Sequence, residues 1–288
     1  MACKILYPRP SIGHICSDAN HNNLRDAGLS SSDDVQKFQK ELIRLTWWND
    51  YDIVDAHAHL HRWSPDFGVS LTARELKRLM RDYHYDKAII MDRDNAWIAR
   101  EVKGSKDLYA NVWVNPKEKD CERTVKTYLK RQNFVGIKLH PLFDGYTPDS
   151  PIVRPVAQLA ESVGVPIQFH CGHPPFSLPW SFEPLAREFP KVKMVLVHMG
   201  HGHIVYINGT IAVAERNKNV YLETSGMPMH TKIKEAMERV GKDRVMYGDD
   251  APCGHPSWEL EKTHVSGLNE KDLRRLLGEN AKKLYGLD

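Results

Sequence analysis

The sequence has few of the features that mark disulfide-rich or membrane proteins. Its 288 residues include five cysteines and no C-x-x-C pair, which excludes a disulfide framework and a zinc knuckle as the basis of the fold. No stretch approaches the roughly 18 uncharged apolar residues of a membrane span. The N-terminus also lacks the apolar run of a signal peptide. We therefore expect no membrane association and a cytoplasmic location.

An excess of either charge is also absent. Lys and Arg number 40 against 37 Asp and Glu, a formal net charge of +3, so nothing indicates a nucleic-acid partner. Hydrophobic residues make up 41% of the chain and charged residues 27%, which is typical of a folded globular protein. A small-molecule substrate is the partner that this composition leaves open.

What the chain does contain is a regular alternation of short apolar runs and amphipathic segments after residue 50. The amphipathic segments predict helices at Thr72–Tyr83, Cys121–Arg131, Ile152–Val163, Phe182–Phe189, Thr210–Arg216 and Thr231–Val240. The apolar runs predict eight strands at Tyr51–His59, Lys87–Met91, Leu108–Val114, Phe134–His140, Val165–His170, Lys193–His198, Asn219–Glu223 and Arg244–Tyr247.

This alternation predicts an α/β fold with parallel strands joined by crossover helices. Eight such units favour a closed (β/α)8 TIM barrel over an open doubly wound sheet. An open sheet of the dinucleotide-binding kind would need a glycine-rich turn after its first strand, and the segment 54–59 has none.

The first 50 residues do not share this alternation. Residues 1–33 are irregular, and a helix with one apolar face is expected from Ser32 to Trp48. We expect residues 1–50 to form an arm and helix that covers the bottom of a barrel domain at 51–288. The alternative is a contact with a second subunit in a homo-oligomer.

Polar residues gather where the predicted strands end, and 15 histidines make the pattern conspicuous. In a (β/α)8 barrel all these positions converge on the C-terminal face, where active sites lie. The residues are His57 and His59, Lys138 and His140, His170, His198, and Asp249 with Asp250.

His57 and His59 are two residues apart on a strand, so their side chains leave the same face and can bind one ion. Such an H-x-H pair is a weak signal alone. Histidines and an acidic pair at other strand ends strengthen it, because a catalytic divalent metal needs three or more N and O ligands.

Lys138 should point inward together with His140. Three interpretations of this lysine compete. It could pair with a carboxylate in the barrel lining, bind a carboxylate of the substrate, or form a carbamylated bridge between two metal ions.

Together these motifs resemble the amidohydrolase superfamily, and within it the amidohydrolase-related group of hydrolases and metal-dependent decarboxylases. The resemblance covers Tyr51 to Leu287. The segments that carry it are Asp55-Ala-His-Ala-His59, Gly136-Ile-Lys-Leu-His-Pro141, Gln168-Phe-His170, Val197-His-Met-Gly200, Asn219-Val-Tyr-Leu-Glu-Thr-Ser225, Tyr247-Gly-Asp-Asp-Ala-Pro252 and Glu279-Asn-Ala-Lys-Lys-Leu-Tyr-Gly-Leu287.

The resemblance implies a divalent metal, with zinc expected, held by His57, His59, His170 and Asp250. Asp250 would act as general base and then acid, and His198 would orient or protonate a developing oxyanion. One ion is expected. A second would be bound by His170 and His198 if Lys138 were carbamylated.

The implied reaction is hydrolysis of an amide, lactone or ester-like bond of a small molecule by a metal-activated water. The alternative keeps the same metal cage but decarboxylates an aromatic or unsaturated acid. A barrel without catalytic activity is a third interpretation, which the complete ligand set disfavours.

Overall fold

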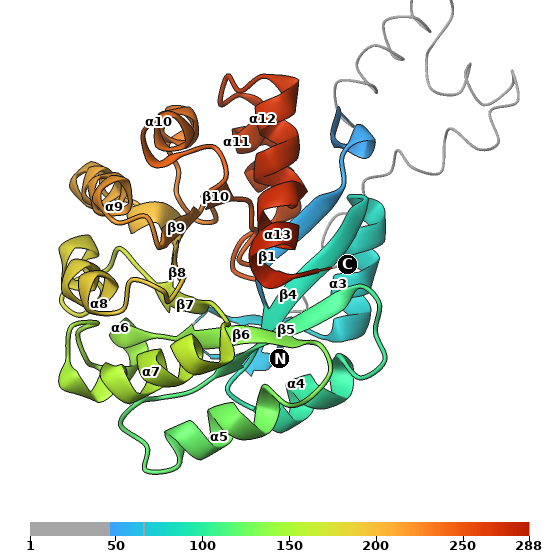
Figure 1. Cartoon of the computed structure of the whole chain (residues 1–288). Helices are drawn as coiled ribbons and strands as arrows, with labels where there is room; N and C mark the ends of the chain where they lie inside the picture. The colour runs from blue at the N-terminus through green and yellow to red at the C-terminus, as the bar shows by residue number, and fades with distance from the viewer. Residues whose placement is uncertain (1–46, 66, 288) are drawn as a thin grey trace, which may run out of the picture.

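The fold is the (β/α)8 barrel that the sequence pattern predicted. The computed structural model describes residues 47–65 and 67–287, so the predicted arm, most of the N-terminal helix and its subunit contact lie outside the described residues. Eight parallel strands pair with their neighbours in chain order (Figure 1). They are β1 (Ile53–His59), β4 (Tyr85–Met91), β5 (Leu108–Trp113), β6 (Phe134–Leu139), β7 (Ile167–His170), β8 (Met194–Val197), β9 (Val220–Glu223) and β10 (Val245–Met246).

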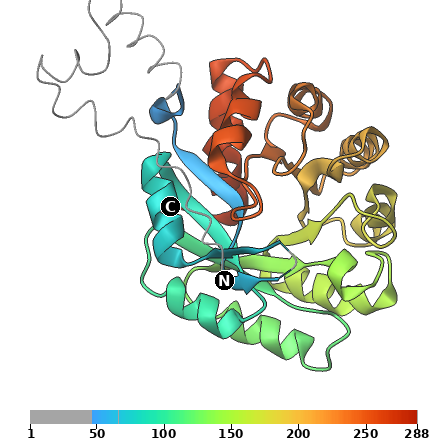
Figure 2. The same ribbon diagram turned by 180° about the vertical axis from the view of Figure 1, so that it is seen from behind.

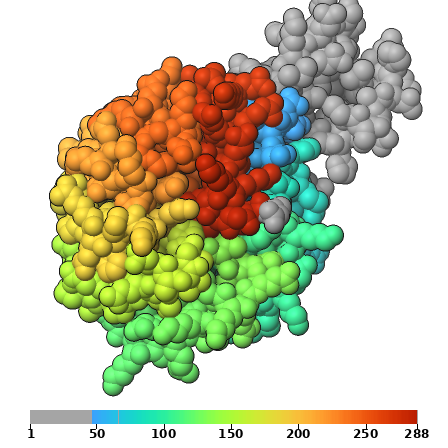
Figure 3. All heavy atoms as spheres, in the orientation of Figure 1, coloured from blue at the N-terminus to red at the C-terminus, as the bar shows by residue number. Residues whose placement is uncertain are grey.

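The helices lie outside the strands, and the strands and helices follow one another around the barrel in chain order (Figures 2 and 3). The longer ones are α3 (Ala73–Asp82), α4 (Asn95–Glu101), α5 (Cys121–Tyr128), α7 (Arg154–Val163), α8 (Glu183–Glu188), α9 (Ile204–Arg216), α10 (His230–Val240) and α11 (Pro256–His264). The short ones are η1 (Trp47–Asp50), α6 (Pro141–Asp144), η2 (Pro151–Val153), η3 (Pro179–Phe182), η4 (His198–Gly200), α12 (Glu270–Arg274), the π-helical η5 (Arg275–Glu279) and α13 (Asn280–Tyr285). Within the described residues, no helix is long and apolar enough to cross a membrane.

Backbone hydrogen bonds between β1 and the segment after β10 join the two ends of the strand order. The amide of Ala56 donates to the carbonyl of Tyr247 (3.1 Å), and the amide of Asp250 donates to the carbonyl of His57 (2.8 Å). The C-terminal elements η5 and α13 also pack against β1. The first and last strands of the barrel are therefore held side by side.

The barrel interior is apolar toward the N-terminal ends of the strands. One buried cluster combines strand residues such as Val54, Ile89 and Val195 with Leu284 and Tyr285 of α13. Buried polar side chains follow on the same strands toward their C-terminal ends. The inner core thus supports a polar floor at the end where active sites of this fold lie.

A local irregularity in β1 determines which of its side chains enter that floor. The pairing of β1 with β4 shifts register between Asp55 and Ala58. Val54 belongs to the inner cluster, whereas Ala58 packs in the outer core. One extra residue in a strand reverses the side to which the following side chains point. Here His57 and His59 therefore point into the barrel, as Val54 does earlier on the strand.

Several elements were not among those predicted from the sequence, including helices α4, α11, α12 and α13 and one hairpin. A short antiparallel hairpin of β2 (His61–Ser64) and β3 (Val69–Leu71) follows β1. It stands between the first strand and α3, where a barrel loop usually lies.

At the opposite end of the barrel, asparagine side chains tie helix ends to the next strand. The Nδ2 group of Asn219, just before β9, donates to the carbonyls of Ala186, Phe189 and Val192 at 3.0 Å each. Asn133 makes the same kind of contact before β6. Carbonyls at a helix C-terminus have no hydrogen-bond donor within the helix, so the side-chain amides of these asparagines act as their donors.

We expect Asn219→Ala to lower the free energy of unfolding by about 2–3 kcal/mol, because buried carbonyls lose their donor. Asn208→Ala, at an exposed position of α9, is the matched control and should change it by less than about 0.5 kcal/mol. Urea denaturation of both variants measures the difference. Equal changes in the free energy of unfolding would show that the hydrogen bonds of Asn219 do not stabilise the fold.

Candidate functional site

Three ligand atoms from opposite ends of the barrel sequence meet at its C-terminal end. The Nε2 atoms of His57 and His59 lie 3.2 Å apart, and each lies 3.3 Å from Oδ1 of Asp250. His57 is fully buried and His59 nearly so. We call these three residues the ligand triangle. Among the described residues they form the group of three that could hold a metal ion.

The edges of the triangle fit a bound divalent metal. Ligand atoms of a tetrahedral zinc ion lie about 2.0–2.1 Å from the metal and therefore about 3.3–3.4 Å from one another. The edges of 3.2–3.3 Å match this spacing. Two imidazole nitrogens and one carboxylate oxygen are also a donor set that zinc and manganese accept.

Gln168 fixes the protonation of His57. Its Nε2 donates to the carbonyl of Ala56 (2.5 Å), which can only accept, so its Oε1 must accept from Nδ1 of His57 (3.0 Å). Nδ1 therefore carries the proton, and Nε2 presents a lone pair to the Asp250 carboxylate. Two lone pairs facing each other at 3.3 Å are stabilised by a cation between them.

Asp250 is held in a demanding backbone conformation. Its φ of 57° lies in the left-handed region, which a non-glycine residue seldom adopts. Hydrogen bonds at its amide, to His57, and at its carbonyl, from Gly254, maintain it. Burial alone would raise the pKa of the carboxyl, but the contact with His59 and the neighbouring histidine rings outweigh it and hold this pKa well below its usual range. Asp250 therefore rests as a carboxylate.

The neighbouring Asp249 points elsewhere. Its carboxyl accepts hydrogen bonds from the hydroxyls of Tyr85 (2.9 Å) and Tyr247, and its amide donates to Asp55 (3.0 Å). Burial, together with the charge of Asp55, raises the pKa of Asp249 well above its ordinary value. Asp249 thus supports β1 from behind and takes no part in the triangle.

His198 lies beside the triangle with its ring orientation fixed. Its Nδ1 donates to the carbonyl of Ser225 (3.0 Å), which leaves Nε2 as the free acceptor. The ring centroid is 5.2 Å from that of His57. Burial lowers the pKa of His198 well below its ordinary value, with a smaller opposing effect from Asp250. The side chain is therefore a neutral imidazole, able to exchange a proton at Nε2.

His170 and His140 lie close by but outside the triangle. The two rings stack with centroids 4.1 Å apart, and the His170 ring lies 4.9 Å from that of His198. The Nε2 of His170 is 2.8 Å from Nδ1 of His173. The structure therefore brings His170 beside His198, while its role as a metal ligand stays a prediction.

Lys138 is fully buried on β6, and its Nζ has no hydrogen-bond partner among the described residues. Burial lowers its pKa to about 7, although Asp250 and Glu223 oppose the shift. No ion pair between Lys138 and a carboxylate is found among the described residues, and the three interpretations of this lysine stay predictions. Its amine is free to contact a carboxylate of the substrate or to be carbamylated.

Two residues that orient the site were not singled out from the sequence. Gln168 and Ser225 both stand within the quoted motifs, but an amide and a hydroxyl carry no chemistry of their own to draw attention. A signal was available for Gln168, which shares a strand face with His170. None was available for Ser225, whose backbone carbonyl (3.0 Å) and Oγ (3.1 Å) both lie within hydrogen-bond distance of Nδ1 of His198.

Comparison with known proteins agrees with this geometry. A family model described as amidohydrolase matches residues 54–287, most of the chain. The chain belongs to the amidohydrolase family. This confirms the resemblance inferred from the strand-end motifs.

Among curated proteins, the chain is similar to the gamma-resorcylate decarboxylase of Rhizobium sp. (strain MTP-10005), with 25% identity over 191 residues. The match covers 50% of this chain and 58% of that enzyme, so the amidohydrolase chain spans less than two thirds of its relative.

Two solved structures show the same fold. One is a dihydroxybenzoic acid decarboxylase from Polaromonas sp. JS666 with bound manganese and the inhibitor 2-nitroresorcinol, 15% identical, with a TM-score of 0.64 over 82% of this chain and 97% of that one. The other is an amidohydrolase from Burkholderia multivorans with bound zinc, 15% identical, with a TM-score of 0.67 over 82% of this chain and 100% of that one. Structural relatives of this amidohydrolase thus bind a divalent metal.

The ligand triangle makes a direct prediction about metal content. Wild-type protein should bind about one divalent ion per chain, and His57→Ala combined with His59→Ala should bind none, because two of three donors are gone. The control His230→Ala, at an exposed position of α10, should keep the ion. Elemental analysis after exhaustive dialysis decides the matter, and full occupancy in the double variant would refute the triangle as the site.

Proposed function

We propose that this amidohydrolase is a metal-dependent decarboxylase of a small aromatic acid. The observation that supports it most is the intact ligand triangle beside an unpaired buried Lys138, in a chain whose matched relatives include decarboxylases of hydroxylated benzoic acids. A buried ammonium group without a partner is a suitable site for a substrate carboxylate.

Hydrolysis of an amide, lactone or ester-like bond is the second candidate. The sequence motifs favour hydrolysis, and the description of the matched family as amidohydrolase also supports it. The relatives support the decarboxylase alternative better than this first interpretation. Both reactions would use the same residues, so the substrate decides between them.

We propose one zinc ion in the triangle, with manganese as the alternative, since relatives of this fold hold either metal. His170, whose Nε2 lies 2.8 Å from Nδ1 of His173, would be the fourth ligand. When bound, the metal would supply a positive charge that polarises a substrate oxygen.

The residues of this chain would bind the substrate and transfer the proton. Decarboxylation replaces the bond between ring and carboxyl carbon by a C–H bond: the electron pair stays on the ring carbon, a proton is added there, and CO2 leaves. Lys138 would bind the carboxylate, and Asp250 would carry the proton from a substrate hydroxyl or water to the ring carbon. His198, whose Nε2 is unprotonated, would accept a hydrogen bond there from a hydroxyl group of the substrate and so orient it.

The product tests the proposal. Protein loaded with zinc or manganese should release CO2 from 2,6-dihydroxybenzoate or another ortho-hydroxylated benzoate, and chelation should abolish the release. In water labelled with ¹⁸O the aromatic product should carry no label. Label in an acid formed from an amide, lactone or ester, without CO2 from any acid offered, would establish the hydrolase instead.

Substitution of Asp250 should lower kcat much more than substitution of Asp249. Asp250→Asn retains an oxygen at the same position but cannot carry the proton, so kcat should fall by roughly 10²–10⁴-fold. Asp249→Asn keeps an acceptor for Tyr85 and Tyr247 and should cost much less, at most about 10–100-fold. Turnover and metal content measured under one condition rank the two. The reverse order would place the proton carrier at Asp249.

A further inference from the structure

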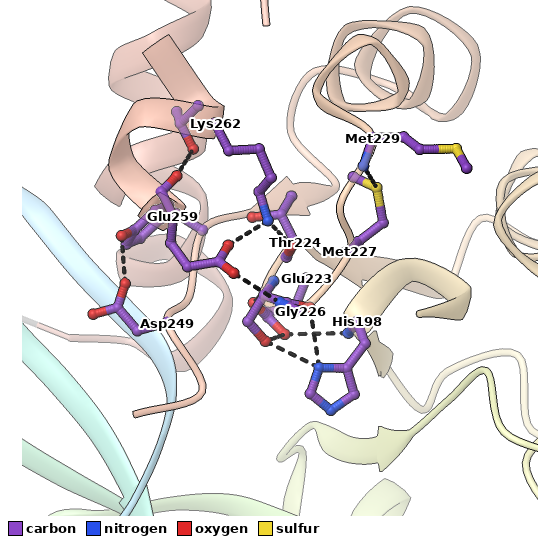
Figure 4. A network of polar contacts seen from close by, with 12 residues as sticks. His198, Glu223, Thr224, Gly226, Met227, Met229, Asp249, Glu259 and Lys262 are labelled. Atoms are coloured by element: carbon purple, nitrogen blue, oxygen red, sulfur yellow. Dashed lines mark hydrogen bonds and ion pairs between the residues drawn. The ribbon is translucent and has the colours of Figure 1, made fainter. Parts of the chain in front are cut away.

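Helix α11 presents a buried Glu259 and a half-buried Lys262 to the loop that follows β9, although it contributes nothing to the ligand triangle. Glu259 is 3% exposed, and one of its oxygens accepts a hydrogen bond from the amide of Gly226 (3.0 Å). Lys262 pairs with the other oxygen, and its Nζ also donates to the carbonyl of Thr224 (2.7 Å). Figure 4 shows this ion pair on one side of the loop and His198 on the other.

The two contacts hold the two peptide groups that flank Ser225. A peptide group is planar, so fixing its N–H also fixes the direction of its carbonyl. Glu259 binds the amide of Gly226, which belongs to the same plane as the Ser225 carbonyl that accepts Nδ1 of His198. Lys262 fixes the preceding plane in the same way.

Glu223, on β9, binds the same loop from the side of the barrel. Its carboxyl accepts the amide (2.5 Å) and the hydroxyl (2.8 Å) of Ser225, and it lies 3.3 Å from the amide of His198. The peptide between Thr224 and Ser225 is therefore held at both ends, at its carbonyl by Lys262 and at its N–H by Glu223.

The loop also packs directly on the imidazole that it orients. Gly226 adopts a φ of 65°, and a Cβ at this position would lie 3.3 Å from Nδ1 of His198. Nδ1 of His198 is also 3.1 Å from Oγ of Ser225, so a displacement of this residue would weaken both contacts at Nδ1 and let the ring turn.

We propose that the Glu259–Lys262 pair is a positioning device for His198, acting through the peptide groups on either side of Ser225. The inference rests on the proposed role of His198 in catalysis. Neither side chain touches the ligand triangle, although the charge of Glu259 reaches Asp250, so an effect through His198 must be separated from a direct effect on that carboxylate.

A double-mutant cycle tests this dependence. Glu259→Ala should lower kcat for the CO2-releasing reaction by roughly 10–100-fold with little change in KM, as expected when a reacting group is misplaced. In a His198→Ala background the same change should cost less than about 2-fold, because the residue it positions is gone. Glu259→Gln keeps an oxygen for the Gly226 amide and should recover part of the loss.

The matched control is Glu261→Ala, which removes an exposed carboxylate from the same helix and should leave kcat unchanged. Equal losses from Glu259→Ala in both backgrounds would show a general structural role and overturn the proposal. Should Glu259→Ala fail to fold, the cycle is completed with Glu259→Gln and Lys262→Met.

A second readout does not depend on activity. In protein labelled with ¹⁵N-histidine, the Nδ1–H signal of His198 is identified by its loss in His198→Ala. Its hydrogen exchange should accelerate at least 10-fold in Glu259→Ala and stay unchanged in Glu261→Ala. Unchanged exchange in Glu259→Ala overturns the positioning role. Absence of turnover with every acid, combined with accelerated exchange, would reject the proposed function and leave the positioning role intact.

Discussion

The site depends on the hydrogen bonds that hold the last strand of the barrel against the first. His57 and His59 lie on β1, whereas Asp250 follows β10, almost 200 residues later. The amide of Asp250 bonds to the carbonyl of His57, so the carboxylate is attached to the strand that carries its partners. Metal binding should therefore strengthen the closure, because the ion would link the same two segments through their side chains.

Burial acts to raise the pKa of each carboxyl group around this closure, but neighbouring groups reverse the net shift at Asp250. Burial raises the pKa of Asp55 to about 7 and that of Glu223 to about 8, despite hydrogen bonds that favour their charged forms. Asp250, beside the two imidazoles, is pushed the other way. Carboxyls with separated pKa values are what proton transfer at neutral pH requires. The structure therefore combines one carboxyl held in its charged form, Asp250, with others that accept hydrogen bonds from backbone amides.

The order and number of the strands could be predicted from the sequence because parallel strands are continuous apolar runs with polar ends. The same pattern located the H-x-H pair and the acidic pair Asp249 and Asp250, since side-chain alternation and convergence at one face are properties of the backbone; the choice of Asp250 came from the family resemblance. What the pattern could not reveal was the register shift in β1, which depends on pairing with β4. The β2–β3 hairpin was missed because His61–Ser64 has no apolar alternation to mark a strand.

Side-chain choices at the site were less predictable still. Lys138 was expected inside the barrel, and it lies there, but only the folded chain shows that no described carboxylate reaches its amine. The pairing of His170 with His173 arises in a loop after β7, where no periodicity applies. Contacts made by backbone groups, such as Ser225 with His198, leave no trace in residue type.

Anomalous diffraction at the zinc and manganese absorption edges tests the central claim most directly, using crystals grown with both metals present. The account predicts one peak per chain, about 2.0–2.2 Å from Nε2 of His57, Nε2 of His59 and Oδ1 of Asp250. A metal bound elsewhere in the barrel, with the triangle vacant, would contradict it.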